Sequence, residues 1–95
     1  MDELVRLTQA LADANRLRLL ELLSRRALCV TAVARELGLS QPLVSQHLRV
    51  LRQAGLIEGE RRGRRVHYRV DRRRWRGLLK ELAGLVSVKG EPSGR

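Results

Sequence analysis

The stretch from Ser40 to Leu56, which reads SQPLVSQHLRVLRQAGL, constrains the fold of this chain most strongly. On a wheel of about 100° per residue, Val44, Leu48 and Leu51 fall within one narrow arc. Another arc carries polar and basic side chains without an acid, although a solvated helix face usually mixes both signs of charge. The pattern predicts a helix over about Gln41–Ala54 with one core face and one face suited to an anionic partner. The side chains of the second face are Gln41, Ser45, Gln46, Arg49, Arg52 and Gln53.

Residues at both ends of this stretch favour the same helix. Ser40 suits the N-cap because its hydroxyl can accept a hydrogen bond from a free first-turn amide. Pro42 falls in the first turn, where its missing N–H costs little. Gly55 suits the left-handed residue just past the helix end. The start and stop signals therefore agree with the periodicity.

A second, shorter helical pattern precedes the first one closely. Its apolar residues recur at i, i+3, i+4 and i+7, with Thr31 as a possible cap and Gly38 as the terminator. Two short helices joined through Gly38, Leu39 and Ser40 form a helix-turn-helix pattern, in which the second helix is the one that enters DNA. The periodic residues are Val30, Val33, Ala34 and Leu37.

Positive charge is concentrated on the second of these helices and on the segment after it. The chain of 95 residues has a net charge of +10, and residues 41–76 hold eleven Arg against three acidic residues. The alternative to a nucleic-acid partner is a plain solvated basic face. We favour the nucleic acid because neutralising phosphates releases counterions, and because the forked guanidinium of Arg suits phosphates and guanine.

The period changes between Leu56 and Val70. Apolar and polar residues alternate over residues 65–70, which is a strand pattern, and Ile57–Arg61 can form the partner strand. Gly63 supplies the turn. Four arginines surround it, and this charge is best explained if the hairpin tip lies against phosphates or in a minor groove, with a merely soluble loop as the alternative. These residues are Arg61, Arg62, Arg64 and Arg65.

A leucine-rich helix is expected behind the helix-turn-helix. It should run from Ala14 to about Ser24 with Asp13 as its cap, and it is apolar around most of its circumference, which is typical of a central helix. The segment Ala27–Val30 is a candidate short strand. The leucines of the helix are Leu17, Leu19, Leu20, Leu22 and Leu23.

Both ends of the chain are predicted as helices with more apolar surface than a domain of this size needs. The first should span Asp2–Ala12, and the last should follow a cap at Asp71 and run from Arg72 to about Val86. We infer a homodimer through these two helices; the alternative is that both pack on their own core. The expected interface residues are Leu4, Leu7, Leu11, Trp75, Leu78, Leu79, Leu82, Leu85 and Val86.

The order of these elements predicts a mainly α winged helix-turn-helix, with about five helices and a two-stranded hairpin wing. Residues 1–88 should form one DNA-binding and dimerisation domain, and residues 89–95 a flexible tail. No signal peptide or membrane-length apolar run is visible, so a cytoplasmic protein without a membrane partner is expected. No Gly-rich phosphate loop or spacing of catalytic groups indicates an enzyme, and no cofactor is implied.

The chain closely resembles the ArsR family of bacterial transcriptional repressors. The resemblance rests on ALADANRLRLLELL, LGLSQPLVSQHLRVLRQAGLI and RRGRRVHYRV, in this order, and covers about residues 8–86. It implies a homodimer that binds an inverted repeat in double-stranded DNA and blocks transcription until an inducer lowers its affinity. The sequence does not name that inducer.

The family pattern also implies roles for residues of the predicted recognition helix. Gln41, Ser45 and Gln46 match positions that contact DNA, and Gln can pair with adenine in a bidentate manner. Arg49 and Arg52 are expected on phosphates. Ser40, at the start of the helix, and His47 complete the candidate DNA contacts, although a packed or backbone-contacting histidine is the favoured alternative for His47.

The resemblance does not extend to the two best-known metal sites of the family. Cys29 matches the first thiol of the arsenic-sensing Cys-Val-Cys motif, but Thr31 replaces the second, and one thiolate cannot form a multi-thiol chelate. After Asp71 the chain has no His, so the ligands of the zinc-type site are missing. We expect no metal site; Cys29 is kept as an alternative sensor thiol, against the favoured interpretation of a buried, inert one.

A sequence-specific repressor is therefore the leading hypothesis. The main alternative is a winged-helix module that binds DNA without sequence preference or binds another protein. A thiol- or metal-responsive repressor acting through Cys29 is a minor alternative.

Overall fold

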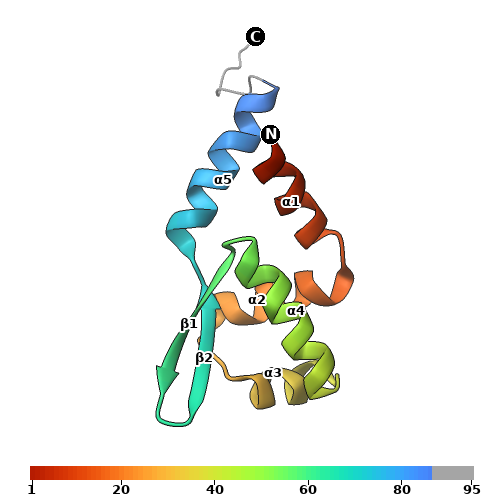
Figure 1. Cartoon of the computed structure of the whole chain (residues 1–95), viewed down its shortest axis with the longest axis vertical. Helices are drawn as coiled ribbons and strands as arrows, with labels where there is room; N and C mark the ends of the chain where they lie inside the picture. Colours follow the sequence, from red (N-terminus) through yellow and green to blue (C-terminus); the bar gives the residue numbers. More distant parts are fainter. Residues whose placement is uncertain (87–95) are drawn as a thin grey trace.

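The computed structural model describes residues 1–86, so the predicted tail at 89–95 and the last two residues of the predicted domain lie outside the described part. Five helices and one antiparallel hairpin succeed each other in the predicted order, and the predicted fold class is confirmed (Figure 1). The elements are α1 (Asp2–Leu11), α2 (Ala14–Arg25), α3 (Val30–Leu37), α4 (Gln41–Gln53), β1 (Ile57–Arg62), β2 (Arg65–Val70) and α5 (Arg72–Leu85).

Helix α2 lies at the centre of the core, as its leucine content predicts. Leu19 and Leu23 are almost completely buried, and Asp13 caps the helix by accepting from the backbone N–H of Arg16 at 3.1 Å. Leu17 differs from the other leucines of this apolar circumference, since 52% of it is exposed. The core around α2 is Leu4, Leu7, Ala10, Leu20, Leu28, Val33, Ala34, Val44, Leu48, Leu51, Leu56, Ile57 and Leu78.

Helices α3 and α4 form the helix-turn-helix. Gly38 ends α3 with φ of 68°, and the Ser40 hydroxyl accepts from the backbone N–H of Leu43 at 3.3 Å, so the predicted terminator and cap are confirmed. The predicted cap at Thr31 is wrong. Helix α3 begins at Val30 with Cys29 in the N-cap position, because the chain leaves an extended contact with the hairpin at Leu28.

Strands β1 and β2 form the wing. Their antiparallel register pairs Ile57 with Val70 and Arg62 with Arg65, and Gly63 makes the turn with φ of 65°. The strand expected at Ala27–Val30 is reduced to a single bridge between Leu28 and Tyr68, with two backbone hydrogen bonds of 3.0 and 2.8 Å. This bridge holds the wing to the segment that enters α3.

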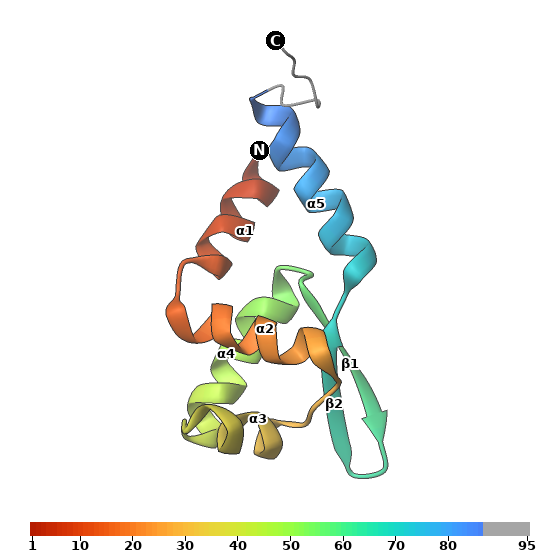
Figure 2. The same ribbon diagram turned by 180° about the vertical axis from the view of Figure 1, so that it is seen from behind.

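Helices α1 and α5 project together from the core as an arm, which gives the molecule an elongated shape of 52 × 22 × 22 Å (Figures 1 and 2). Leu78 of α5 is 2% exposed, and Arg74 pairs with Glu3 of α1. At the base of the arm, the indole N–H of Trp75 donates to the carbonyl of Leu56 at 3.1 Å. The arm is thus joined to the end of the helix-turn-helix. Among residues 1–86, no helix is both long and apolar enough to cross a membrane.

Candidate nucleic-acid interface

The two faces of α4 differ as the wheel predicts. Val44, Leu48 and Leu51 are at most 2% exposed and belong to the core. Within residues 1–86, the polar side chains of the opposite face make no hydrogen bond or ion pair with other parts of the protein, so they are free to meet a ligand. The exposed residues of this face are Gln41, Ser45, Gln46, Arg49, Arg52 and Gln53.

A groove of about 210 Å³ joins α4 to the base of the wing. Arg49 and Arg52 line it from α4, together with Ser45, and Tyr68 lines it from β2. The structure therefore brings the basic end of the α4 polar face next to the wing. A surface that curves from a helix to an adjoining hairpin can follow a duplex from its major groove to the flanking backbone.

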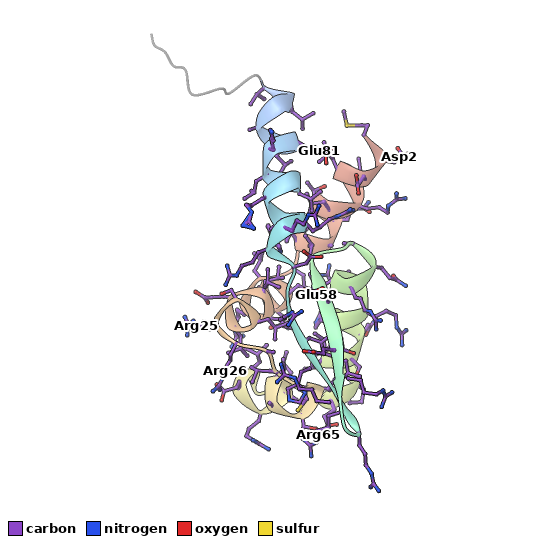
Figure 3. All side chains as sticks on the ribbon, turned by 90° about the vertical axis from the view of Figure 1, so that its left-hand side faces the viewer. Asp2, Arg25, Arg26, Glu58, Arg65 and Glu81 are labelled. Atoms are coloured by element: carbon purple, nitrogen blue, oxygen red, sulfur yellow. The ribbon has the colours of Figure 1, made fainter. Side chains whose placement is uncertain are left out.

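The wing arginines are all exposed at the tip, where Figure 3 labels Arg65. They differ in what else they contact. Arg62 pairs with Glu60 at 3.3 Å, Arg61 donates to the carbonyl of Gly63 at 3.5 Å, and Arg65 donates to the Cys29 thiol at 3.5 Å. Arg64 has no such partner within residues 1–86.

Acidic residues of β1 neutralise part of the wing charge. Glu58 accepts from Arg69 at 3.1 Å across the hairpin, and this hydrogen bond, together with the charge of Glu58, raises the pKa of the Arg69 guanidinium. Glu60 lies 3.7 Å from Arg69 as well as next to Arg62. Sequence reasoning counted these acids but missed their pairing, which results from the strand register alone, since Glu58 stands opposite Arg69.

His47 does not share the exposed face. Its side chain is only 6% exposed, and a guanidinium N–H of Arg16 lies 3.3 Å from its Nδ1. This burial supports the packed alternative and removes His47 from the candidate DNA contacts. His67 is half-buried on β2.

Cys29 is 8% exposed at the N-cap of α3. Hydrogen bonding from the backbone N–H of Ala32 is the main cause that lowers the pKa of this thiol, and Arg65 adds to it, while burial opposes the shift. In the part of the chain that the structure describes, no three His, Cys, Asp or Glu side chains gather as metal ligands.

The predicted dimer residues fall into three groups. Leu4, Leu7 and Leu78 are buried in the core of their own chain, so a partner would gain little from them. Leu11, Trp75 and Leu82 pack on that core and are partly buried. Leu79, Leu85 and Val86 are more than half exposed. Sequence reasoning missed the other large apolar side chains that are exposed within residues 1–86, which are Met1, Val5 and Leu17.

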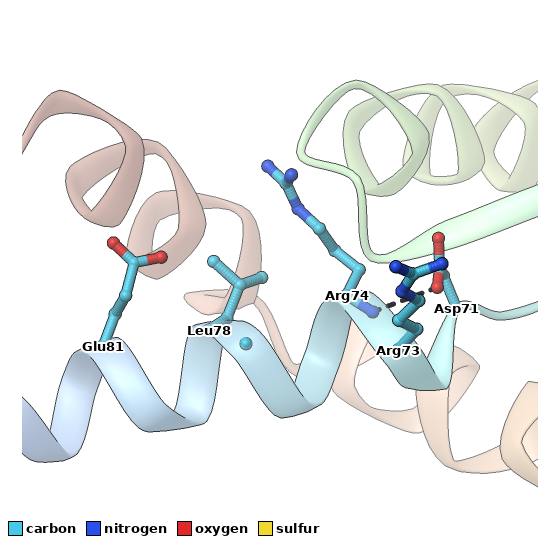
Figure 4. Close-up of a pocket in the computed structure, with 6 residues that line it drawn as sticks. Asp71, Arg73, Arg74, Leu78 and Glu81 are labelled. Carbon is cyan, nitrogen blue, oxygen red and sulfur yellow. Dashed lines mark hydrogen bonds between the residues drawn. The ribbon is translucent and has the colours of Figure 1, made fainter.

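Two of the pockets within residues 1–86 lie along α5. One, of about 330 Å³, is lined by Asp71, Arg73, Arg74, Gly77, Leu78 and Glu81, and Figure 4 shows Arg74, Leu78 and Glu81 on the face of α5 that is turned toward α1. The other, of about 400 Å³, lies between α2 and α5 beside Trp75 and Leu79. Both are open surface hollows at the base of the arm, apart from the α4 face.

Comparison with known proteins places this geometry among transcriptional regulators. The sequence model of the bacterial regulatory proteins of the arsR family matches residues 13–59. The chain is 40% identical over 74 residues to a Synechocystis transcriptional repressor SmtB homolog, covering 78% of this chain and 56% of the relative. It is 36% identical over 94 residues to the HTH-type transcriptional regulator Rv2034 of Mycobacterium tuberculosis, covering 87% and 88%.

A solved structure shares the whole described architecture. It is the homodimeric winged helix-turn-helix DNA-binding domain of a possible ArsR-family regulator from Mycobacterium bovis. It matches with a TM-score of 0.75 and 28% identity, over 99% of this chain and 89% of that one. The present chain spans only about half the length of most of the curated relatives that it matches.

Proposed function

Because the chain belongs to the arsR family of bacterial regulatory proteins, we propose that it is a homodimeric, sequence-specific DNA-binding transcriptional repressor. The observation that carries the proposal is the exposed face of α4, which holds polar and basic side chains without an acid above a fully buried opposite face. Relatives named as repressors, such as the Synechocystis SmtB homolog, support the same function.

In this proposal α4 enters the major groove. Gln41, Ser45 and Gln46 read base edges, with Ser40 at the start of the helix beside them. Arg49 and Arg52 bind phosphates, because they lie toward the wing where the duplex backbone would pass.

The wing then lies on a minor groove or on phosphates. Arg64 is its best-placed contact, because the other three arginines already have protein partners. All three contribute charge, and Arg61 and Arg62 can exchange their exposed contacts for phosphate at little cost, whereas the contact of Arg65 with Cys29 is partly buried. These residues are Arg61, Arg62 and Arg65.

Two copies would join through the arm, within a single domain that we assign to residues 1–88. The exposed apolar side chains Val5, Leu79 and Leu85 are the best candidates for this contact, because they gain most from burial. We place the dimer in the cytoplasm, where it meets DNA as an inverted repeat with half-sites about one helical turn, or a multiple of it, apart.

Footprinting on the DNA upstream of its own gene tests the proposal. We expect a protected palindrome, and a much lower affinity for random DNA of equal length at the same salt concentration. Equal affinity for both DNAs would instead favour a winged-helix module without sequence preference. Failure to bind either DNA would point to a protein partner.

A further inference from the structure

A single arginine, Arg16, joins three helices where the arm meets the helix-turn-helix. Arg16 belongs to the first turn of α2, and its Nε donates to the carbonyl of Ala10 at 2.6 Å. One terminal nitrogen donates to the carbonyl of Gln9 at 3.1 Å, and the other lies 3.3 Å from Nδ1 of His47. The guanidinium thus spans the last turn of α1 and the middle of α4.

The chemistry of this contact is well matched on the α1 side. Carbonyl groups of the last helical turn carry partial negative charge, so a cation there stabilises them. The Gln9 carbonyl also accepts from the backbone N–H of Ala12 at 3.3 Å. Asp13 lies 3.9 Å from the same guanidinium and balances its charge. Arg16 is consequently held in place by α1 and α2 whether or not α4 contacts it.

On the α4 side, Arg16 determines which of the two nitrogens carries the proton of the neutral His47 ring. A guanidinium has donors only, so Nδ1 must accept and the neutral ring must carry its proton on Nε2. Nε2 is buried and has no hydrogen-bond partner within residues 1–86. Over that part of the chain, Arg16 is therefore the sole hydrogen-bond partner of a ring that is 6% exposed.

We propose that Arg16 is a positioning residue that sets the rotation of the recognition helix through His47 and links that rotation to helix α1. His47 comes directly after Ser45 and Gln46 in α4, so anchoring its ring fixes the direction in which these two side chains leave the helix. The inference rests on the proposed function, because it assigns a role in reading DNA to a residue that does not touch DNA.

The dimensions of a helix make this contact relevant to recognition. A rotation of α4 by about 10° moves a side chain about 5–6 Å from the helix axis by about 1 Å. A binding constellation must be held to about 0.5 Å. The close-packed side chains of Val44, Leu48 and Leu51 hold α4 firmly against the core. A hydrogen bond adds a preferred direction that apolar contacts do not have. Arg16 supplies the directional constraint.

Two substitutions of His47 test the proposal. His47→Asn places an oxygen close to the position of Nδ1 and keeps the acceptor, whereas His47→Leu fills the space without one. We expect His47→Leu to weaken binding to the footprinted site about ten- to hundredfold. Binding to random DNA and the salt dependence should stay unchanged, because no phosphate contact is lost. His47→Asn should restore most of the specific affinity.

A double-mutant cycle identifies Arg16 as the partner. Arg16→Met keeps the alkyl stem and should weaken specific binding as His47→Leu does, while the double variant should be no worse than either single one. Arg18→Met is the matched control, since Arg18 lies on the same helix and, within residues 1–86, hydrogen-bonds only to Asn15, at 3.5 Å. Additive losses from Arg16→Met and His47→Leu would overturn the pairing. Equal specific affinity of His47→Leu and wild type would overturn the positioning role.

Nitrogen NMR of the free protein tests the contact without DNA. We expect the neutral ring of His47 to be the Nε2–H tautomer, and its ring nitrogen shifts to change in Arg16→Met. An Nδ1–H ring in the wild type would overturn the inference even if footprinting succeeds. If the wild type does not distinguish its site from random DNA, the proposed function fails, and the NMR result alone decides whether the Arg16–His47 contact exists.

Discussion

The recognition helix and the wing carry the same kind of charge but are built differently. Helix α4 buries one entire face, with Val44 and Leu51 at 0% exposure, and keeps its polar side chains free. In the wing only Ile57 of β1 is buried, and several arginines are paired with acids or with Cys29. A rigid support with unpaired side chains suits the reading of bases. A loosely packed hairpin with partly neutralised charge suits contact with the phosphate backbone of DNA, which is the same whatever the base sequence.

The largest expected difference is in stability. Leu51→Ala removes a fully buried side chain beneath α4 and should lower the free energy of unfolding by about 2–5 kcal/mol. Val66→Ala, at a half-buried position of the wing, should cost at most about 1 kcal/mol. Urea unfolding of both variants measures this. Similar losses would show that the wing shares the core as fully as α4 does.

A second pair of substitutions separates reading from charge. Gln41→Ala should cost about 1–3 kcal/mol on the specific site and little on random DNA. Arg64→Ala should weaken both DNAs about equally and flatten the salt dependence of binding by about one ion. Titrations at several salt concentrations measure both effects. If both variants changed the affinities for specific and random DNA in the same way, the assignment of base reading to α4 and of phosphate binding to the wing would be wrong.

Matched glycines probe how firmly each turn is held. Gly38 and Gly63 have φ of 68° and 65°, and an added Cβ would meet no atom within 4 Å at either one. Alanine therefore introduces backbone strain alone, about 1–2 kcal/mol in the left-handed region. Gly38→Ala should show this cost in full in thermal unfolding. Gly63→Ala should show less, because a wing tip that frays before global unfolding does not transmit its strain.

The smallest effect is expected at the ion pair of the wing. Glu58 and Arg69 are about half exposed, so Glu58→Gln should change stability very little. DNA affinity should rise slightly at low salt, because the variant removes a negative charge near phosphates and releases Arg69. A loss of DNA affinity would mean that this pair shapes the wing rather than merely reducing its charge.

Local signals predicted the fold well because each acts within a few residues. Hydrophobic period, a serine cap and left-handed glycines placed α4 and the wing where the structure has them. The exception at the start of α3 has a tertiary cause. The Leu28–Tyr68 bridge holds the chain extended until Cys29, and Thr31 cannot reveal a partner so far along the chain.

Features that depend on packing between helices could not be read from the sequence. The periodicity of α5 on a helical wheel does not show that Leu78 is buried in the core while Leu79, the next residue, is 55% exposed. Nor does a wheel show that Arg16, one of many arginines in a basic chain, turns inward to meet His47. Exposure and partner choice depend on where a second element passes, and the periodicity of one element carries no such information.

Trp75 gives the molecule its own optical reporter. It is the sole tryptophan of the chain, and its indole N–H is tied to Leu56, a residue just past the end of the recognition helix. Any movement of the arm relative to the helix-turn-helix must stretch or break that hydrogen bond and change the water around the indole ring of Trp75. The emission of the native, unlabelled protein should therefore follow such movement in real time.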